Sequence, residues 1–216
     1  MESNKESYNL IITGVGGQGN VLSSELIGQF FISKGYFVTI GETYGASQRG
    51  GAVMSHIRIS QKRQLSPLIP RGKADVVMAL EPVEALRVLV LYGNPYVAVL
   101  VNTHPIYPVD ATAGNEAYPK IEDIKKTIDN LSQRVYYIDG TKRAMEIGSP
   151  ILVNMIMIGA LVELKLLPIN ADGFRETLSG KFDKKRLDIN TKAFEEGRRT
   201  VSAAYSRALD RKEKNR

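Results

Sequence analysis

The sequence predicts an α/β fold of the Rossmann-like type, with a mostly parallel twisted sheet, helices on both faces and an antiparallel strand. Short apolar runs alternate with helical patterns, the first run enters a glycine-rich turn, and one later run alternates polar and apolar residues. The 216 residues are 43% hydrophobic and 24% charged, and they contain no internal repeat or linker. We therefore expect a single domain over residues 1–216.

The N-terminal part of the chain has the pattern of strand, helix and strand. Two apolar runs and the helical spacing between them predict these elements at residues 8–13, 36–41 and 21–34. Together they predict a right-handed βαβ unit. Residues 52–60 alternate, which predicts an antiparallel strand with one outward face. His56 and Arg58 lie on that face, where we expect a polar surface, with contact to a partner as the alternative.

The remaining elements follow in order. Further strands are predicted at 74–80, 96–101 and 135–138, and further helices at 83–92, 121–131, 174–178 and from 194 onward. Residues 65–72 contain two prolines and predict a connection. The Pro-, Gly- and Asn-rich segment 102–120 is long for a loop, so we expect it to be functional or interfacial. Asp139 is expected to cap the next helix rather than bind a ligand. Residues 145–167 predict a buried helix, packed on the sheet or on another subunit.

Charge and composition exclude several classes of protein. The net charge is +6, but residues 181–216 hold 12 Lys or Arg against 6 Asp or Glu, so the first 180 residues are neutral. We interpret the basic tail from about residue 206 as a solvated, frayed end and expect no nucleic-acid binding. There are no cysteines and two histidines, which disfavours disulfides, iron–sulfur ligation and zinc sites. We find no signal peptide or membrane span, and expect a cytoplasmic protein.

The glycine-rich turn is the first candidate binding site. It comprises Gly14, Gly16, Gly17, Gln18, Gly19 and Asn20. Its glycines fit the G-x-G-x-x-G pattern, and Glu42 lies where a ribose-binding acid would be expected. The turn precedes a helix, whose first N–H groups and positive dipole end favour an anionic group. The alternative is a tight turn whose glycines serve only packing.

A second glycine-rich loop, after the second strand, contains Ser47, Gln48 and Arg49. Arg49 could pair with a phosphate or carboxylate in a bidentate fork. The alternative is a surface loop whose arginine is merely solvated. Because ligands of open α/β sheets bind outside the carboxyl ends of strands, we expect both glycine-rich segments at one edge of the sheet. We identify no catalytic residues and no metal ligands, because no His or carboxylate pair forms a convincing catalytic set.

Several motifs in this order carry a resemblance to a known family. They are Gly14–Gly19 followed by a helix, Tyr44–Val53 opening an alternating strand, Ala74–Pro82 and Val153–Met155. Over roughly residues 8–200 the chain resembles the gamma-type subunit of 2-oxoacid:ferredoxin oxidoreductases, the pyruvate/ketoisovalerate oxidoreductase gamma domain. The stretch 102–119 makes it most similar to the beta subunit of indolepyruvate:ferredoxin oxidoreductase, which belongs to the same family.

The resemblance implies an accessory subunit of an enzyme that decarboxylates a 2-oxoacid on thiamine diphosphate. The enzyme transfers the acyl group to coenzyme A and passes electrons through iron–sulfur clusters to ferredoxin. This chain lacks cysteine and a Gly-Asp-Gly motif with a downstream Asn. We therefore expect it to bind no cofactor alone, with thiamine diphosphate, magnesium and the clusters on a larger partner subunit. Coenzyme A is a substrate that the two subunits could share at the candidate residues.

Two other functions remain open on the sequence alone. The first is a stand-alone Rossmann-type NAD(P)-binding oxidoreductase, in which the turn from Gly14 to Gly19 holds the pyrophosphate and Glu42 the ribose. The second is a non-catalytic interaction protein whose glycine-rich loops bind nothing.

Overall fold

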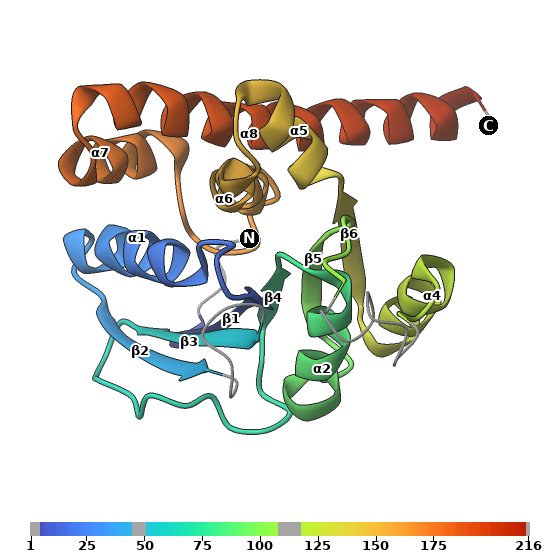
Figure 1. The fold of residues 1–216 in the computed structure, drawn as a ribbon. Coiled ribbons are helices and arrows are strands. Elements are labelled where there is room, and N and C mark those ends of the chain that lie inside the picture. Colours follow the sequence, from blue (N-terminus) through green and yellow to red (C-terminus); the bar gives the residue numbers. More distant parts are fainter. Residues whose placement is uncertain (1–4, 45–50, 108–117, 215–216) are drawn as a thin grey trace.

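The computed structural model describes residues 5–44, 51–107 and 118–214, including the side chains except those of 44 and 204–214. A six-stranded mixed sheet in the order β2-β3-β1-β4-β5-β6 forms its centre, with helices on both faces (Figure 1). The strands are β1 (Ser7–Val15), β2 (Phe37–Tyr44), β3 (Ala52–Ser60), β4 (Val76–Ala79), β5 (Ala98–Asn102) and β6 (Arg134–Ile138). The sheet confirms the predicted α/β class.

The strand order differs from a simple βαβ unit. The helix α1 (Asn20–Ser33) connects β1 to β2 as predicted, but β3 lies between these two strands and is antiparallel to both. The short connection from β2 to β3 explains this arrangement, because consecutive strands joined by a short loop pair antiparallel. On the other side of β1, the strands β4, β5 and β6 are all parallel.

Two layers of helices bury the two faces of the sheet (Figure 1). One face packs on α1 and α6 (Val153–Glu163), with α5 (Gly140–Ile147), α7 (Ala171–Lys181) and α8 (Lys184–Lys214) around them. The other face packs on α2 (Pro82–Tyr92) and α4 (Ile121–Leu131). Alternate residues serve the two cores, so that Ile12 and Met78 belong to the first and Ile11 and Val77 to the second.

The apolar stretch predicted as one buried helix is two helices. The first, α5, ends before Gly148, whose φ of 139° does not suit a helix, and the turn η1 (Pro150–Leu152) then leads into α6. Every residue from 153 to 162 is buried, because α6 lies between the sheet and α8 of the same chain. Of the two alternatives left open by the sequence, packing within the chain is therefore confirmed. Among the described residues, none of the helices has the length and apolarity needed to cross a bilayer.

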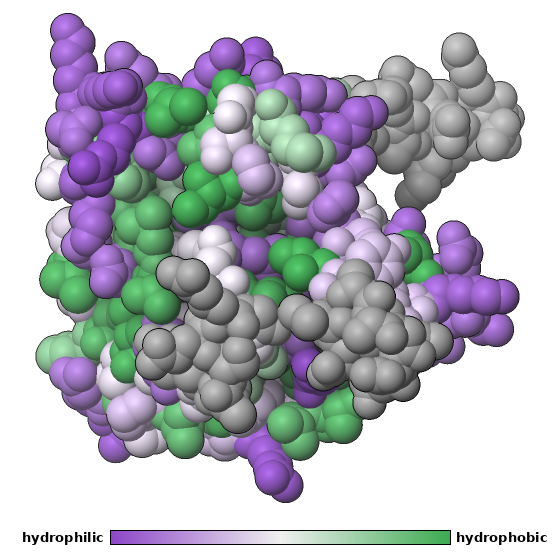
Figure 2. All heavy atoms as spheres, viewed as in Figure 1, coloured by the Kyte–Doolittle hydropathy of each residue, from purple (hydrophilic) through white to green (hydrophobic). Residues whose placement is uncertain are grey.

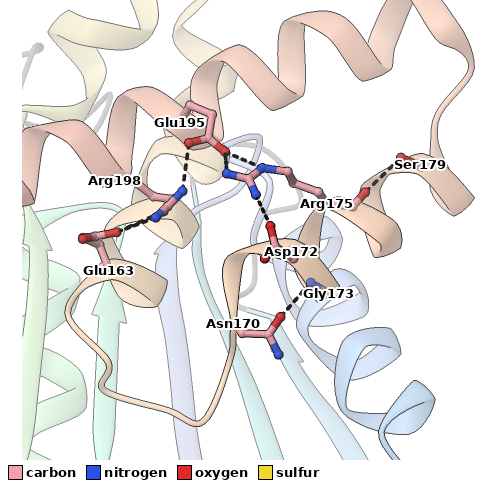
Figure 3. Close-up of polar contacts among 8 residues, drawn as sticks. All are labelled: Glu163, Asn170, Asp172, Gly173, Arg175, Ser179, Glu195 and Arg198. Carbon is pink, nitrogen blue, oxygen red and sulfur yellow. Dashed lines mark hydrogen bonds and ion pairs between the residues drawn. The ribbon is translucent and has the colours of Figure 1, made fainter.

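A chain of ion pairs joins the end of α6 and the start of α7 to the middle of α8 (Figure 3). Arg198 contacts Glu163 and Glu195 at 3.0 Å each, and Arg175 contacts Glu195 at 2.7 Å and Asp172 at 2.5 Å. Because the two arginines share one carboxylate, the pairs form a network that orients α8 across the layer. The helix α8 extends to Lys214, so the backbone of the predicted frayed tail is helical through that residue.

The polar face of β3 is covered by a loop, with His56 and Ser60 buried and Arg58 partly exposed, which corrects the prediction of an outward surface. The predicted connection runs over this face, and His56 is wholly buried beneath it. The N–H of Ile69 donates to His56 Nδ1 at 3.4 Å, and the ring of Tyr92 lies edge-on to the imidazole, with centroids 5.0 Å apart. Arg58 donates to the carbonyl oxygen and the hydroxyl of Ser66 at 3.2 and 2.9 Å. The alternating residues of 52–60 distinguish the two faces of the strand, but they do not show that a loop covers the polar face.

Burial of His56 predicts a pH dependence of stability. Burial lowers the pKa of His56 below its ordinary value of 6.5, and no described residue forms a hydrogen bond with its Nε2. The unfolded chain therefore binds the proton more readily, so the free energy of unfolding should fall as the pH falls below about 6.5. We expect urea titrations between pH 7.5 and 5 to show a steeper loss for the wild type than for His56→Phe. Parallel pH profiles would contradict this prediction.

Candidate functional site

The candidate site lies at one edge of the sheet. Strands β1, β2, β4, β5 and β6 end at this edge, and β3 begins there. The pairing of Val15 with Ala52 and of Ala79 with Val101 shows this alignment. The predicted meeting of the two glycine-rich segments is confirmed for the residues described, since the N–H of Gly16 donates to the carbonyl oxygen of Gly51 at 2.9 Å. Ser47, Gln48 and Arg49 lie outside the described residues. We call this edge the carboxyl edge.

Glycines shape the turn between β1 and α1. Gly17 and Gly19 have φ of 101° and 88°, which favours glycine, and a Cβ on Gly14 would lie 2.6 Å from Gln18 Oε1. Gln18 is buried, accepts from the N–H of Val15 at 2.7 Å and donates to the carbonyl oxygen of Leu80 at 2.8 Å. Its amide is therefore engaged within the fold, and Gln18 braces the turn.

The first turn of α1 is open to an anion. Among the described residues, no side chain caps this helix and its first turn holds no acidic residue, so within that part of the chain its N–H groups and positive dipole end are unopposed. The Nδ2 of Asn20 donates to the carbonyl oxygen of Val53 at 3.0 Å, and its buried Oδ1 has no hydrogen-bond partner among the described residues. A Cβ on Gly17 would meet no described atom within 4 Å. In the described part of the chain, the turn therefore presents backbone donors that no other group occupies.

The side chain of Asn154, from α6, lies against the turn, and no role was predicted for it from the sequence. Asn154 is 3% exposed, and a Cβ on Gly19 would lie 2.3 Å from its Nδ2. Its Oδ1 accepts from the N–H of Met155 at 2.7 Å, while its Nδ2 has no acceptor among the described residues. The sequence signal for such a role is one amide side chain among the buried apolar residues 153–162, which suggests a specific contact.

Asn102 ties the strands of this edge together. It is completely buried and donates through Nδ2 to the carbonyl oxygen of Leu80 and to Thr141 Oγ1, each at 2.9 Å. Its Oδ1 accepts from the N–H groups of Gly140 and Thr141 at 3.0 and 3.2 Å. Because Gln18 donates to the same carbonyl of Leu80, one peptide group joins the glycine turn to the start of α5.

Glu81 lies at the carboxyl edge, at the start of α2. It caps α2 by accepting from the N–H of Glu84 at 2.9 Å, and it also accepts from the hydroxyl of Tyr118 at 2.5 Å. Burial and this carboxylate raise the pKa of Tyr118, so its hydroxyl stays a donor. The segment 102–120, predicted to be functional or interfacial, contacts Glu81 through Ile106 and Tyr118, whereas residues 108–117 lie outside the described residues. Asp139 accepts from the N–H of Lys142 at 3.3 Å, which confirms that it caps α5.

Glu42 does not occupy the position of a ribose-binding acid. Its strand is separated from β1 by β3, and its two carboxylate oxygens accept from Ser24 Oγ at 2.9 Å and Ser55 Oγ at 2.7 Å. This carboxylate therefore joins α1 to the sheet, which corrects the expectation on which the dinucleotide interpretation depended. In a Rossmann fold the acid follows the strand next to the glycine turn.

The geometry supports binding rather than acid–base chemistry. The described part of the edge offers backbone N–H groups, the amide of Asn154 and the buried carboxylate of Glu81, which is already accepting hydrogen bonds. In the parts of the chain that the structure describes, no three His, Asp or Glu side chains gather as metal ligands. Such an edge can hold and orient an anionic ligand.

Comparisons with known proteins agree on one family. The family model for pyruvate ferredoxin/flavodoxin oxidoreductase matches residues 9–200. Indolepyruvate oxidoreductase subunit IorB of Pyrococcus horikoshii is 37% identical over 193 residues, which cover 89% of this chain and 95% of that protein. Pyruvate oxidoreductase subunit PORC of Thermotoga maritima has the same fold, with a TM-score of 0.67 and 20% identity over 91% of this chain and 97% of that one.

A further solved structure is that of 2-oxoglutarate:ferredoxin oxidoreductase from Magnetococcus marinus, with 2-oxoglutarate, coenzyme A and succinyl-CoA bound. It matches 93% of this chain with a TM-score of 0.72 and 25% identity. The match covers only 32% of that longer chain, so this chain spans about a third of its length.

Proposed function

Because the chain belongs to the pyruvate ferredoxin/flavodoxin oxidoreductase family, we propose that it is the accessory, gamma-type subunit of an indolepyruvate:ferredoxin oxidoreductase. This enzyme decarboxylates 2-oxoacids oxidatively to acyl-CoA with ferredoxin as the electron acceptor. The observation that carries the proposal is the 37% identity to an IorB subunit over nearly the full length of both chains.

The composition of the chain supports placing the cofactors on another subunit. The chain has no cysteine to ligate an iron–sulfur cluster. A larger partner subunit therefore holds the clusters, the thiamine diphosphate and its magnesium, and ferredoxin meets the complex through that subunit. The contribution of this chain is to complete the complex and to bind a substrate group at the carboxyl edge.

We assign the carboxyl edge to coenzyme A, at the residues predicted from the sequence. The uncapped start of α1 would hold a phosphate, with the backbone of Gly16, Gly17 and Gly19 allowing close approach. Asn154 would add an amide donor from α6. Ser47, Gln48 and Arg49, outside the described residues, belong to the same proposal. The fully engaged amide of Gln18 supports a role in shaping the turn rather than in contacting the ligand.

Reconstitution tests the proposed function. We expect the purified chain to show no iron–sulfur absorbance and no turnover of indolepyruvate with coenzyme A and ferredoxin. Adding the larger subunit of the same organism should produce a stable complex and turnover that neither chain shows alone. Turnover by this chain without a companion would contradict the proposal, as would a larger subunit whose rate is unchanged by its addition.

A further inference from the structure

A groove lies at the edge of the sheet opposite the carboxyl edge. It is bounded by the starts of β1, β4, β5 and β6 and by the turn from α6 to α7, residues 164–170, which runs between Glu163 and Asn170 in Figure 3. Its volume of about 920 Å³ is within the range of roughly 300–1,000 Å³ that is usual for ligand pockets. We call it the amino-edge groove, and its lining includes Tyr8, Val76, Ala98, Arg134, Lys165 and Leu167.

The floor of the amino-edge groove is apolar. Val76, Ala98 and Leu167 line it and are each at most 3% exposed, so they belong to the interior of the fold. Tyr8 and Tyr96 add aromatic rings to the lining, and Tyr96 is 76% exposed. An apolar or aromatic body of a ligand therefore finds both a buried floor and rings to pack against.

The two carboxylates that line the groove are fully engaged by the fold. Asp75 accepts from Lys5 through Oδ1 at 2.5 Å and from a backbone N–H of β1 through Oδ2 at 2.8 Å. Glu163 accepts from Arg198 through Oε2 at 3.0 Å and from Ser202 Oγ through Oε1 at 2.8 Å. Because each carboxylate oxygen already has a partner, neither acid is available to bind a cation.

The other two charged side chains of the lining are cations without a partner. Arg134 and Lys165 are both exposed, and within the described part of the chain neither side chain forms an ion pair or a hydrogen bond. The described lining therefore has an excess of two positive charges. This balance favours an anionic ligand, since a charge-assisted hydrogen bond to a carboxylate is stronger than one to a neutral group.

Lys165 also has an unusual backbone conformation. It follows the end of α6 with a φ of 53°, and the other described residues of positive φ are glycines. Helices usually place Gly or Asn at such a left-handed position, because other side chains are strained there. Strain of this kind is found where a side chain serves a ligand. The chain thus keeps a cation at the groove where a glycine would be less strained.

A charged surface by itself is not evidence of a ligand site. Hydrophilic side chains also gather where α7 meets α8, at the upper left of Figure 2. There, Lys181 pairs with Glu25 and Arg186 with Asp183, as on an ordinary solvated surface. In the amino-edge groove the unpaired cations instead stand beside a buried apolar floor, which is what an anion with an apolar body requires.

We propose that the amino-edge groove is a second ligand site of this chain, for a small carboxylate with an apolar or aromatic body. The body lies on the floor formed by Val76, Ala98 and Leu167. The carboxylate meets Lys165 and Arg134, whose guanidinium can bind it through two N–H groups. Because the groove lies at the other end of the strands from the carboxyl edge, this site is separate from the residues assigned to coenzyme A and does not depend on the proposed function.

A titration of the isotope-labelled full chain with phenylacetate, followed by NMR of the backbone amides, tests this site. Phenylacetamide has the same ring without the charge, and inorganic phosphate is an anion without an apolar body, so these are the control ligands. We expect saturable shifts with phenylacetate at residues 164–170 and at the starts of β4, β5 and β6. Both control ligands should bind much more weakly.

Three variants show whether the two cations hold the carboxylate. Lys165→Gly and Arg134→Gln each remove one of them, and Lys126→Gln removes an exposed cation of α4 as the matched control. Glycine suits a φ of 53° and the other two side chains are exposed, so all three variants should be at least about as stable in urea as the wild type. We expect each groove variant to bind phenylacetate roughly fivefold more weakly and Lys126→Gln to bind it like the wild type.

Several results would overturn the proposal. One is the absence of saturable shifts up to ~10 mM phenylacetate, and another is a set of shifts at the carboxyl edge instead. Equal affinity for phenylacetamide would show that the cations contribute nothing, and equal affinity for phosphate would show a charged surface without a use for its apolar floor. Unchanged binding of phenylacetate by both groove variants would likewise contradict it.

Discussion

Gly197→Ala should destabilise the chain strongly, because the added methyl group has no room between α6 and α8. A Cβ on Gly197 would lie 1.9 Å from the carbonyl oxygen of Ile156, and a Cβ on Gly159 would lie 2.0 Å from that of Phe194. In both cases the obstacle is backbone, so no side chain can rotate away. Separating α6 from α8 would disturb the helix that covers the sheet, and we expect a loss of roughly 3–5 kcal/mol, at the upper end of overpacking effects.

Denaturant unfolding followed by circular dichroism measures this loss. Gly180→Ala is the matched control, because Gly180 lies in α7 and a Cβ there would meet no atom within 4 Å. Alanine favours helix over glycine, so this variant should gain up to about 1 kcal/mol. A Gly197→Ala variant as stable as the wild type would show that the two helices do not cross at this contact.

The elements with a strong local pattern were predicted well. The amphipathic helix at 121–131 and the alternating strand at 52–60 have the predicted bounds, because each has a clear period of its own. The break before α6 was missed, since apolar side chains continue through Gly148 and Pro150 while the backbone does not. The crossing of α6 over α8 depends on Gly159 and Gly197, which lie far apart in the sequence.

The arrangement of the sheet could not be predicted from local patterns. Nothing in residues 8–60 shows that β3 inserts between β1 and β2, and this insertion removes Glu42 from the glycine turn. The burial of His56 likewise depends on a connection that crosses its face. Strand order and loop coverage are tertiary features, whereas periodicity reports only which face of an element is apolar.

The candidate site, too, could be predicted from the sequence only in part. The glycine turn follows from sequence, because positive φ and a helix start require those residues in that order. Asn102 has no such signal, since an asparagine at the end of a strand is also an ordinary loop residue. Its four hydrogen bonds become visible only once β4, β5 and α5 are brought together.

Gly17→Asn should separate ligand binding from packing at the turn, the two interpretations that the sequence left open. Gly17 has a φ of 101° and no described atom within 4 Å of its Cβ position, so asparagine, which is enriched among non-glycine residues of positive φ, adds backbone strain but no steric overlap. In the assembled enzyme the new side chain would enter the space assigned to coenzyme A. We expect the apparent KM for coenzyme A to rise about tenfold, or ~1.4 kcal/mol, with the KM for the 2-oxoacid unchanged.

Gly35→Asn is the control that isolates the ligand. Gly35 also has a positive φ, 82°, and no atom within 4 Å of its Cβ position, but it follows the opposite end of α1. The same substitution therefore imposes a similar backbone demand away from the carboxyl edge, and it should leave both KM values unchanged. If the two variants behave alike in steady-state kinetics, the glycines of the turn serve packing alone. A rise confined to Gly17→Asn and to the KM for coenzyme A would support a ligand beside the start of α1, because Gly35→Asn places the same side chain at a positive φ away from that edge.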